Sequence, residues 1–219
     1  MVLSKPLYLI TDGGALRSKN LLELRVQAAL GGASGRIAFV QLREQMSDSG
    51  FAAASDDEIL QLLKKLTAAC HTAGAKILIN RRLDLALAGG ADGVHLGGGN
   101  PVAVAAARKE LGSSATVGYS AHQREEALSA MEHGASYILY GPVFPPLSKV
   151  SARSPLGLDA LFALTSKVSV PVYGLGGITV ANAGLCRQAG ATGVACITSI
   201  VSSPDPHTAV QQMLTAWDS

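Results

Sequence analysis

The chain repeats one pattern along its length: a helical run, small residues such as Gly-Ala, then a short apolar strand that ends in a polar residue. Each expected strand is apolar on both faces, as in a parallel sheet covered by helices. The pattern predicts eight strands, at Leu7–Thr11, Ile37–Leu42, Lys76–Ile79, Gly93–Leu96, Ala115–Tyr119, Ser136–Tyr140, Val170–Tyr173 and Gly193–Ile197. Expected helices are Asn20–Leu30, Glu58–Thr72, Leu83–Ala88, Pro101–Leu111, Arg124–Glu132, Leu158–Val168, Pro206–Trp217 and a run between the last two strands.

Eight such units within 219 residues predict an α/β fold, a single (β/α)8 TIM barrel. An open, doubly wound sheet is the alternative. No linker or shift of composition interrupts the chain, so residues 1–219 are expected to form one domain.

The composition excludes several classes of protein. A hydrophobic content of 48% with 16% charged residues indicates a globular core, not a disordered chain. A net charge of +2 is too small to suggest nucleic-acid binding. No stretch has the length of a membrane span or signal peptide, and the cysteines Cys70, Cys186 and Cys196 are expected to be buried thiols, so a cytoplasmic location is expected.

Two strand ends near the C-terminus suggest a phosphate site. The strand from Val170 runs into Gly174-Leu175-Gly176-Gly177, and the next strand ends in Thr198-Ser199. Glycine lets an oxyanion approach the backbone closely, and barrels of this kind bind phosphate after strands seven and eight. The alternative is that these glycines only form tight turns.

Basic residues gather at the same expected rim. Arg43, Arg82 and Lys149 follow strand ends, with Arg81 beside them. Guanidinium groups and backbone amides suit a phosphorylated small molecule. Each residue taken alone is more often a solvated charge, but several that converge at strand ends favour a binding site.

Two histidines and a loop have uncertain roles in this pattern. His122 follows the fifth strand beside Ser120, where it could transfer protons near neutral pH. His95 lies inside the fourth strand and is either functional or a hydrogen-bonded rim residue. Residues 46–57 form a long polar loop with a functional role open. Asn100 is expected to cap the helix that begins at Pro101.

The chain resembles the superfamily of thiamine phosphate synthases and thiazole tautomerases over nearly its whole length. The similarity rests on motifs that include Gln41-Leu42-Arg43-Glu44, Ala91 to Gly97, Ser120-Ala121-His122, Tyr140 to Pro145 and Gly176-Gly177-Ile178. The resemblance implies the barrel fold and an enzyme of thiamine biosynthesis.

For the synthase branch, the resemblance implies that a pyrimidine diphosphate is joined to a thiazole phosphate with the help of Mg²⁺. Gln41, Arg43 and Asn80 would contact the pyrimidine diphosphate, and Ser120 and Lys149 would face its leaving group. The thiazole phosphate would be bound by Gly177, Ile197 and Thr198, helped by Ser148. Gly176 of the same glycine turn is a further candidate phosphate contact.

The sequence departs from the synthase pattern where that pattern binds metal. Arg81 stands in place of an expected aspartate, and Gly98-Gly99-Asn100 replaces a stretch with the second carboxylate. Gln45 and Pro146 replace an expected lysine and threonine. A guanidinium about 4 Å from a divalent cation repels it by roughly 8 kcal/mol at an effective dielectric near 20. Mg²⁺ prefers anionic oxygen ligands, so we expect no metal unless the synthase interpretation holds.

The tautomerase branch needs no metal, only a phosphate site, a cationic contact for a carboxylate and one histidine. The sequence therefore favours a thiazole tautomerase with His122 as general acid and base and Ser120 beside it. Arg82 is a further candidate substrate contact.

Two alternatives stay open: a thiamine phosphate synthase, and a non-catalytic protein that binds thiazole phosphate. The expected partners are phosphorylated thiazoles and, for the synthase alternative, a pyrimidine diphosphate, with neither nucleic acid nor membrane. A homodimer and a site role for Asp12 are undecided.

Overall fold

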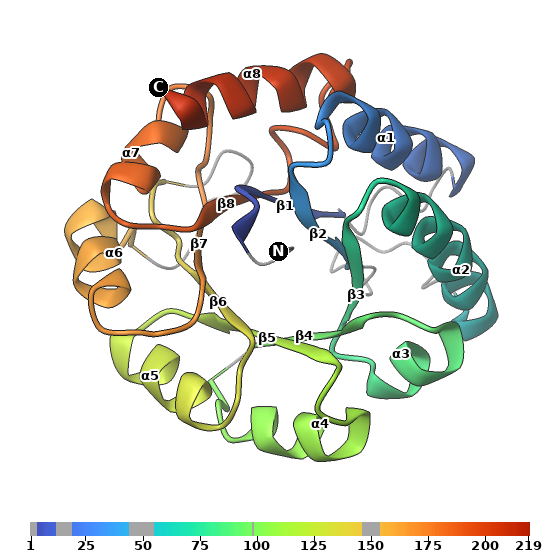
Figure 1. Ribbon diagram of the computed structural model, residues 1–219, viewed down its shortest axis with the longest axis horizontal. Coiled ribbons are helices and arrows are strands. Elements are labelled where there is room, and N and C mark those ends of the chain that lie inside the picture. Colours follow the sequence, from blue (N-terminus) through green and yellow to red (C-terminus); the bar gives the residue numbers. More distant parts are fainter. Residues whose placement is uncertain (1–3, 12–18, 44–54, 98, 146–153) are drawn as a thin grey trace.

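The computed structural model describes residues 4–11, 19–43, 55–97, 99–145 and 154–219, and Figure 1 shows its strands arranged in a ring inside a ring of helices. The strands are β1 (Leu7–Ile10), β2 (Ile37–Leu42), β3 (Lys76–Asn80), β4 (Gly93–Gly97), β5 (Thr116–Ala121), β6 (Tyr137–Tyr140), β7 (Val172–Leu175) and β8 (Gly193–Cys196). The helices are α1 (Lys19–Gly32), α2 (Asp56–Thr72), α3 (Leu83–Gly89), α4 (Ala103–Leu111), α5 (Arg124–Glu132), α6 (Gly157–Thr165), α7 (Ala183–Gln188) and α8 (Pro206–Asp218).

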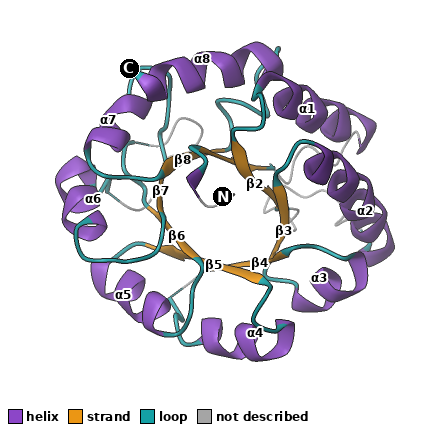
Figure 2. Cartoon of the chain, in the orientation of Figure 1, coloured by secondary structure: helices purple, strands orange, loops and turns teal. Residues whose placement is uncertain are grey.

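The sheet is a closed parallel barrel in the order of the sequence, β1 to β8. Closure is direct, because β1 pairs in parallel with β8 and Leu9 lies opposite Cys196. The TIM-barrel prediction is therefore confirmed, and the doubly wound alternative is wrong. Every pairing between neighbouring strands is parallel, so the carboxyl ends of the strands, which form the inner ring in Figure 2, meet at one mouth.

Aromatic rings fill the interior of the barrel. Tyr8, Phe39, Tyr137 and Tyr173 pack against one another, with the ring centroids of Phe39 and Tyr137 4.8 Å apart. Gly118 explains how so large a ring fits, since a Cβ at this position would overlap the Tyr137 ring. The centre of the barrel is thus a packed layer that forms a floor beneath the mouth.

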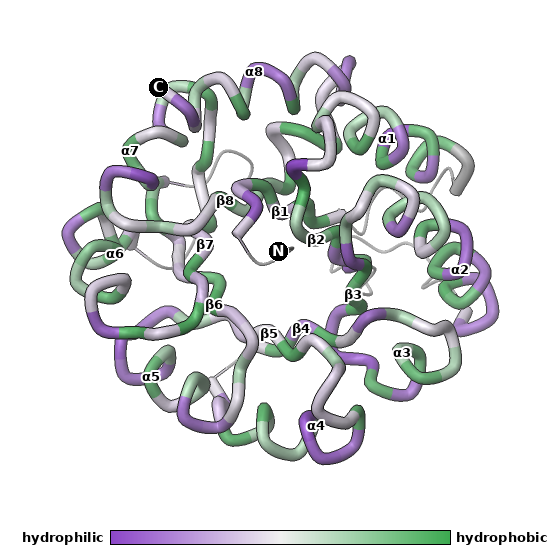
Figure 3. The backbone as a smooth tube through the Cα atoms, viewed as in Figure 1, coloured by the Kyte–Doolittle hydropathy of each residue, from purple (hydrophilic) through white to green (hydrophobic). Residues whose placement is uncertain are grey.

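The larger core lies between the strands and the helices. It contains the outward-facing side chains of each strand and one face of each long helix, for example Leu62, Leu63 and Leu66 of α2. The alternation of apolar and polar colour along the helices in Figure 3 matches this arrangement. All three cysteines are buried and unpaired, as expected. Within the described segments, no helix has the length and apolar character that crossing a bilayer requires.

One local prediction is wrong. Asn100 does not cap α4, which begins at Ala103 with Val102 at the N-cap position and no side-chain cap. The residues before it form a tighter turn, in which the backbone N–H of Val104 donates to Pro101 O at 3.1 Å. Such i to i−3 bonds at a helix start satisfy the first amides without a side chain.

Candidate functional site

A pocket of about 350 Å³ occupies the mouth of the barrel. Every strand or the residues just after it contribute to its wall, and the lining residues are Ile10, Gln41, Arg43, Asn80, Arg81, His95, Leu96, Gly97, Ser120, His122, Leu139, Leu175 and Ile197. The pocket thus brings together Gln41, Arg43, Asn80, Ser120, His122 and Ile197, six of the residues that the sequence singled out.

A chain of hydrogen bonds crosses the floor of this pocket. The Gln41 amide donates from Nε2 to Asn80 Oδ1 at 2.9 Å, and its Oε1 accepts from the Tyr8 hydroxyl at 3.0 Å. The Tyr8 and Tyr137 hydroxyl oxygens lie 2.7 Å apart. Because the Tyr8 proton is already donated to Gln41, Tyr137 must donate to Tyr8.

The same logic fixes the proton positions on His95. Its Nδ1 lies 2.9 Å from Tyr137 Oη, and its Nε2 lies 2.7 Å from Ser120 Oγ. Since Tyr137 donates elsewhere, His95 donates from Nδ1, and Nε2 accepts the Ser120 proton. Ser120 therefore presents oxygen lone pairs to the pocket and no hydrogen.

The environment of His95 keeps its ring neutral. Burial, together with the positive charges of Arg43 and Arg81, lowers the pKa of His95 to about 3. A neutral ring is what the hydrogen-bond chain requires, because only an unprotonated Nε2 can accept from Ser120. The structure therefore shows His95 as a hydrogen-bonded residue in the floor of the pocket, whose wall it also lines.

His122 lies at the edge of the mouth. Its Nδ1 donates to the carbonyl oxygen of Gly141 at 2.5 Å, and its backbone N–H donates to the Glu126 carboxylate at 2.8 Å. A carbonyl only accepts, so the neutral ring carries its lone pair on Nε2. The residue also lines a neighbouring pocket of about 340 Å³, with Gln123 and Pro142 in its wall.

Two arginines face the mouth without an acidic partner in the part of the chain that the structure describes. The Arg43 backbone N–H donates to Thr11 Oγ1 at 2.9 Å, and Arg81 donates from Nη2 to the Gly97 carbonyl at 3.3 Å. The second contact is long and leaves most donors of that guanidinium unused.

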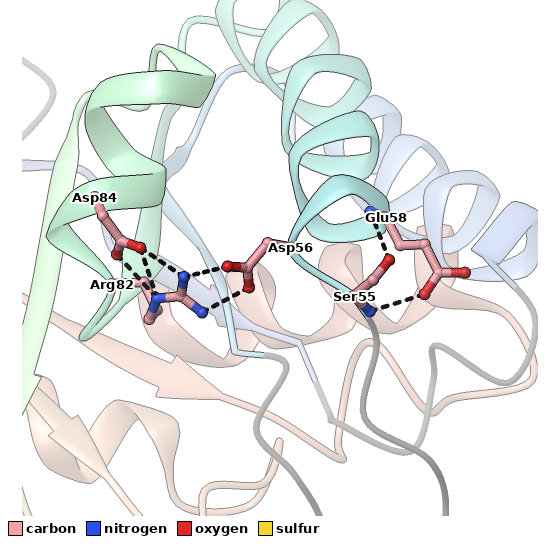
Figure 4. Close-up of polar contacts among 5 residues, drawn as sticks. All are labelled: Ser55, Asp56, Glu58, Arg82 and Asp84. Atoms are coloured by element: carbon pink, nitrogen blue, oxygen red, sulfur yellow. Dashed lines mark hydrogen bonds and ion pairs between the residues drawn. The ribbon is translucent and has the colours of Figure 1, made fainter.

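Arg82 is not part of this set. Its guanidinium pairs with Asp56 at 2.7 and 2.8 Å and also contacts Asp84 (Figure 4). The pair joins the start of α3 to the start of α2, where Ser55 and Glu58 form a capping box. Arg82 therefore lies outside the pocket lining, in a solvent-exposed ion-pair cluster.

Close packing, and not only a phosphate site, explains the glycines in the turn after β7. Gly176 and Gly177 have φ values of +95° and +64°. A Cβ on Gly177 would lie 2.8 Å from the Phe144 Cβ and overlap the carbonyl oxygen of Pro145. The turn thus packs closely against the segment after β6. Neither glycine lines the mouth pocket, nor does Thr198, whereas Ile197 does.

Several sequence predictions fall outside the described residues. These are the candidate contacts Ser148 and Lys149, the undecided Asp12, the replacements Gln45, Gly98 and Pro146, and most of the loop at 46–57.

Tyr8 and Tyr137, which connect the two ends of the chain of hydrogen bonds, were not predicted from the sequence. A signal was available in the alternation of side chains along a strand. Tyr8 and Ile10 are two residues apart and so face the same side of β1, and the same holds for Phe39 and Gln41 in β2. What the spacing does not reveal is which strands place their polar atoms within bonding distance.

Comparison with known proteins gives one family. The sequence matches the model of the thiamine monophosphate synthase family over residues 7–200. It is 43% identical over 209 residues to a Geobacter sulfurreducens protein named "Putative thiamine-phosphate synthase", covering 95% of this chain and 92% of that protein. It is 37% identical to the thiamine-phosphate synthase of Chloroflexus aurantiacus, covering 94% and 90% of the two chains.

A solved structure agrees with these matches. The thiamine phosphate pyrophosphorylase from Pyrococcus furiosus superposes with a TM-score of 0.81 at 28% identity. The superposition covers 99% of this chain and 97% of that one. The similarity in fold therefore extends over nearly the whole chain.

Proposed function

Because the chain belongs to the thiamine monophosphate synthase family of thiamine-biosynthesis enzymes, we propose that it is itself a thiamine phosphate synthase. Its substrates would be a pyrimidine diphosphate and a thiazole phosphate, and its products thiamine phosphate and diphosphate. Relatives with this name match nearly the full length of the chain. Their names favour the synthase over the tautomerase that the sequence analysis preferred.

The proposed reaction needs no proton transfer. The lone pair of the thiazole nitrogen forms a bond to the methylene carbon of the pyrimidine, and the bond from that carbon to the diphosphate oxygen breaks. The electron pair of the broken bond leaves with diphosphate. Catalysis then depends on aligning two rings and stabilising negative charge on the leaving group.

The observation that carries the proposal is the composition of the mouth pocket. Arg43 and Arg81 supply positive charge for the leaving group, while the amides of Gln41 and Asn80 supply hydrogen bonds to a heterocycle. Apolar side chains opposite them, Leu139 and Leu175 among others, provide a surface for a flat ring.

Incubation of the purified chain with both substrates, followed by chromatographic detection of thiamine phosphate, tests the proposal. We expect product with the wild-type chain and a loss of about tenfold or more in kcat/KM for Gln41→Ala. The substitution removes a proposed substrate contact, and it takes away the donor to Asn80 Oδ1 and the acceptor of the buried Tyr8 hydroxyl. No product under any condition would contradict the proposal.

His122 supports thiazole tautomerase as a second candidate. Its Nδ1 contact with Gly141 O leaves Nε2 as a proton acceptor in a residue that lines the mouth. Isomerisation of thiazole carboxylate phosphate, lost in His122→Ala, would establish this activity. Binding of thiazole phosphate without turnover of either substrate would instead identify a non-catalytic binder.

A further inference from the structure

Arg43 and Arg81 differ in their partners from three other described arginines, each of which forms an ion pair with a carboxylate. Arg36 pairs with Asp218, Arg82 with Asp56, and Arg124 with Glu125. By contrast, neither Arg43 nor Arg81 pairs with a carboxylate in the described residues, although both line a concave pocket. Two uncompensated charges in a pocket concentrate a positive field that favours a multiply charged anion.

The backbone of Arg81 adds a second observation. Its φ is +62°, and among the described residues only Ser34 is another non-glycine with positive φ. This conformation is unfavourable for an arginine, and such strain is often found at binding sites. It is held by the Arg81 backbone N–H, which donates to His95 O at 3.0 Å.

The pocket does not fit a divalent cation. Its described lining contains no carboxylate, and no group of three His, Cys, Asp or Glu in the described segments could bind a metal. The neutral side-chain oxygens of Gln41 and Asn80 already accept hydrogen bonds, Asn80 Oδ1 from Gln41 Nε2 and Gln41 Oε1 from the Tyr8 hydroxyl. Mg²⁺ prefers anionic oxygens, and the two guanidinium groups repel it.

The Ser120 hydroxyl does not replace the divalent cation as a partner for the diphosphate. Its hydroxyl proton is donated to His95 Nε2, so a diphosphate oxygen would meet only lone pairs there. The described donors that remain available to an anion at this side of the mouth are chiefly those of Arg43 and Arg81.

We propose that Arg43 and Arg81 together bind the diphosphate group directly and take the place of a divalent cation at this mouth. The leaving group would be stabilised by guanidinium hydrogen bonds as the carbon–oxygen bond breaks and its electron pair passes to the diphosphate. The inference rests on the proposed function for the identity of the diphosphate ester, while binding of diphosphate itself can be measured alone.

Calorimetric titration of the full chain with inorganic diphosphate in excess chelator tests the proposal. We expect binding without metal, no tightening when Mg²⁺ replaces the chelator, and affinity lower by about tenfold or more in Arg81→Gln and in Arg43→Gln. Arg124→Gln removes the same charge outside the pocket and serves as the matched control, with unchanged affinity.

Charge reversal provides a sharper variant. In Arg81→Asp a carboxylate would stand in the mouth, so we expect diphosphate binding to require Mg²⁺. Aspartate tolerates positive φ, so we expect the variant to fold. Thermal melting of the variant checks that it does. Binding by the wild-type chain only with Mg²⁺, or unchanged affinity in Arg81→Gln, would overturn the proposal.

The two proposals fail separately. Metal-free diphosphate binding without formation of thiamine phosphate would contradict the proposed function and leave the arginine site intact. Formation of thiamine phosphate only in the presence of Mg²⁺ would support the proposed function and overturn the arginine site.

Discussion

At the scale of single residues, the site is organised by the direction of its hydrogen bonds. The Gln41 amide fixes the proton of Tyr8, and each following group can then donate in only one direction until Ser120 is reached. A side chain at one edge of the pocket thereby determines whether another, across the barrel, is a donor or an acceptor.

The tautomer of His95 is the first prediction at this scale. In the absence of ligand, the proton should reside on Nδ1, because Nδ1 donates to Tyr137 Oη. Nitrogen-15 NMR of the labelled histidine distinguishes the two ring nitrogens. A proton on Nε2 would mean that the chain of hydrogen bonds runs in the opposite direction.

The second prediction concerns stability and pH. The pKa of His95 is lowered to about 3 in the folded chain, whereas the unfolded value is about 6.5. The unfolded state therefore binds the extra proton first, so the stabilisation is complete above about pH 6.5 and is lost as the pH falls towards 3.

Urea unfolding at about pH 7.5 and about pH 5 measures this effect. Between these two conditions, the wild-type chain should lose about 2 kcal/mol more free energy of unfolding than His95→Gln, which cannot titrate. The comparison cancels the carboxylates that both chains share. Equal pH dependence in the two chains would show that His95 is not held neutral.

At the scale of elements, the turn after β7 and the segment after β6 form one unit. Val143 N–H donates to Leu175 O at 2.8 Å, and Phe144 N–H donates to Gly176 O at 3.1 Å. This pairing continues the β6–β7 contact beyond the strands and requires glycine at the point of closest approach.

The substitution Gly177→Ala tests that unit. We expect a loss of roughly 2–4 kcal/mol in free energy of unfolding, because positive φ and the overlap with Pro145 act together. Gly90→Ala is the matched control: its φ is +68°, with nothing within 4 Å of the added Cβ, so only about 1 kcal/mol should be lost. Equal losses would show that the close contact contributes nothing.

Element boundaries were largely predictable because strand and helix patterns alternate so regularly. The helix starts were less so. The Ser55 to Glu58 capping box was present in the sequence and would have placed the start of α2 two residues earlier, at Asp56. At α4 the helix was predicted to start too early. Asn100 is a favourable cap residue, but it lies in a turn before α4 and does not cap it.

At the scale of the whole molecule, the barrel follows from the count of β/α units, and the location of the site follows from the barrel. Parallel strands bring their carboxyl ends together whatever their sequence, which is why Arg43 and Arg81 could be placed at one rim without a structure. The partners of Arg82 and the link from Tyr8 to Tyr137 depend on packing between distant strands and helices. Those contacts cannot be predicted from the spacing of residues along the chain.

The central claim is that this mouth joins two phosphorylated heterocycles using arginines where a metal would otherwise be required. The most direct measurement is the rate of thiamine phosphate formation from both substrates by the wild-type chain in excess chelator. We expect product at a rate that added Mg²⁺ does not increase. Absence of product in chelator, with or without recovery on adding Mg²⁺, would contradict it.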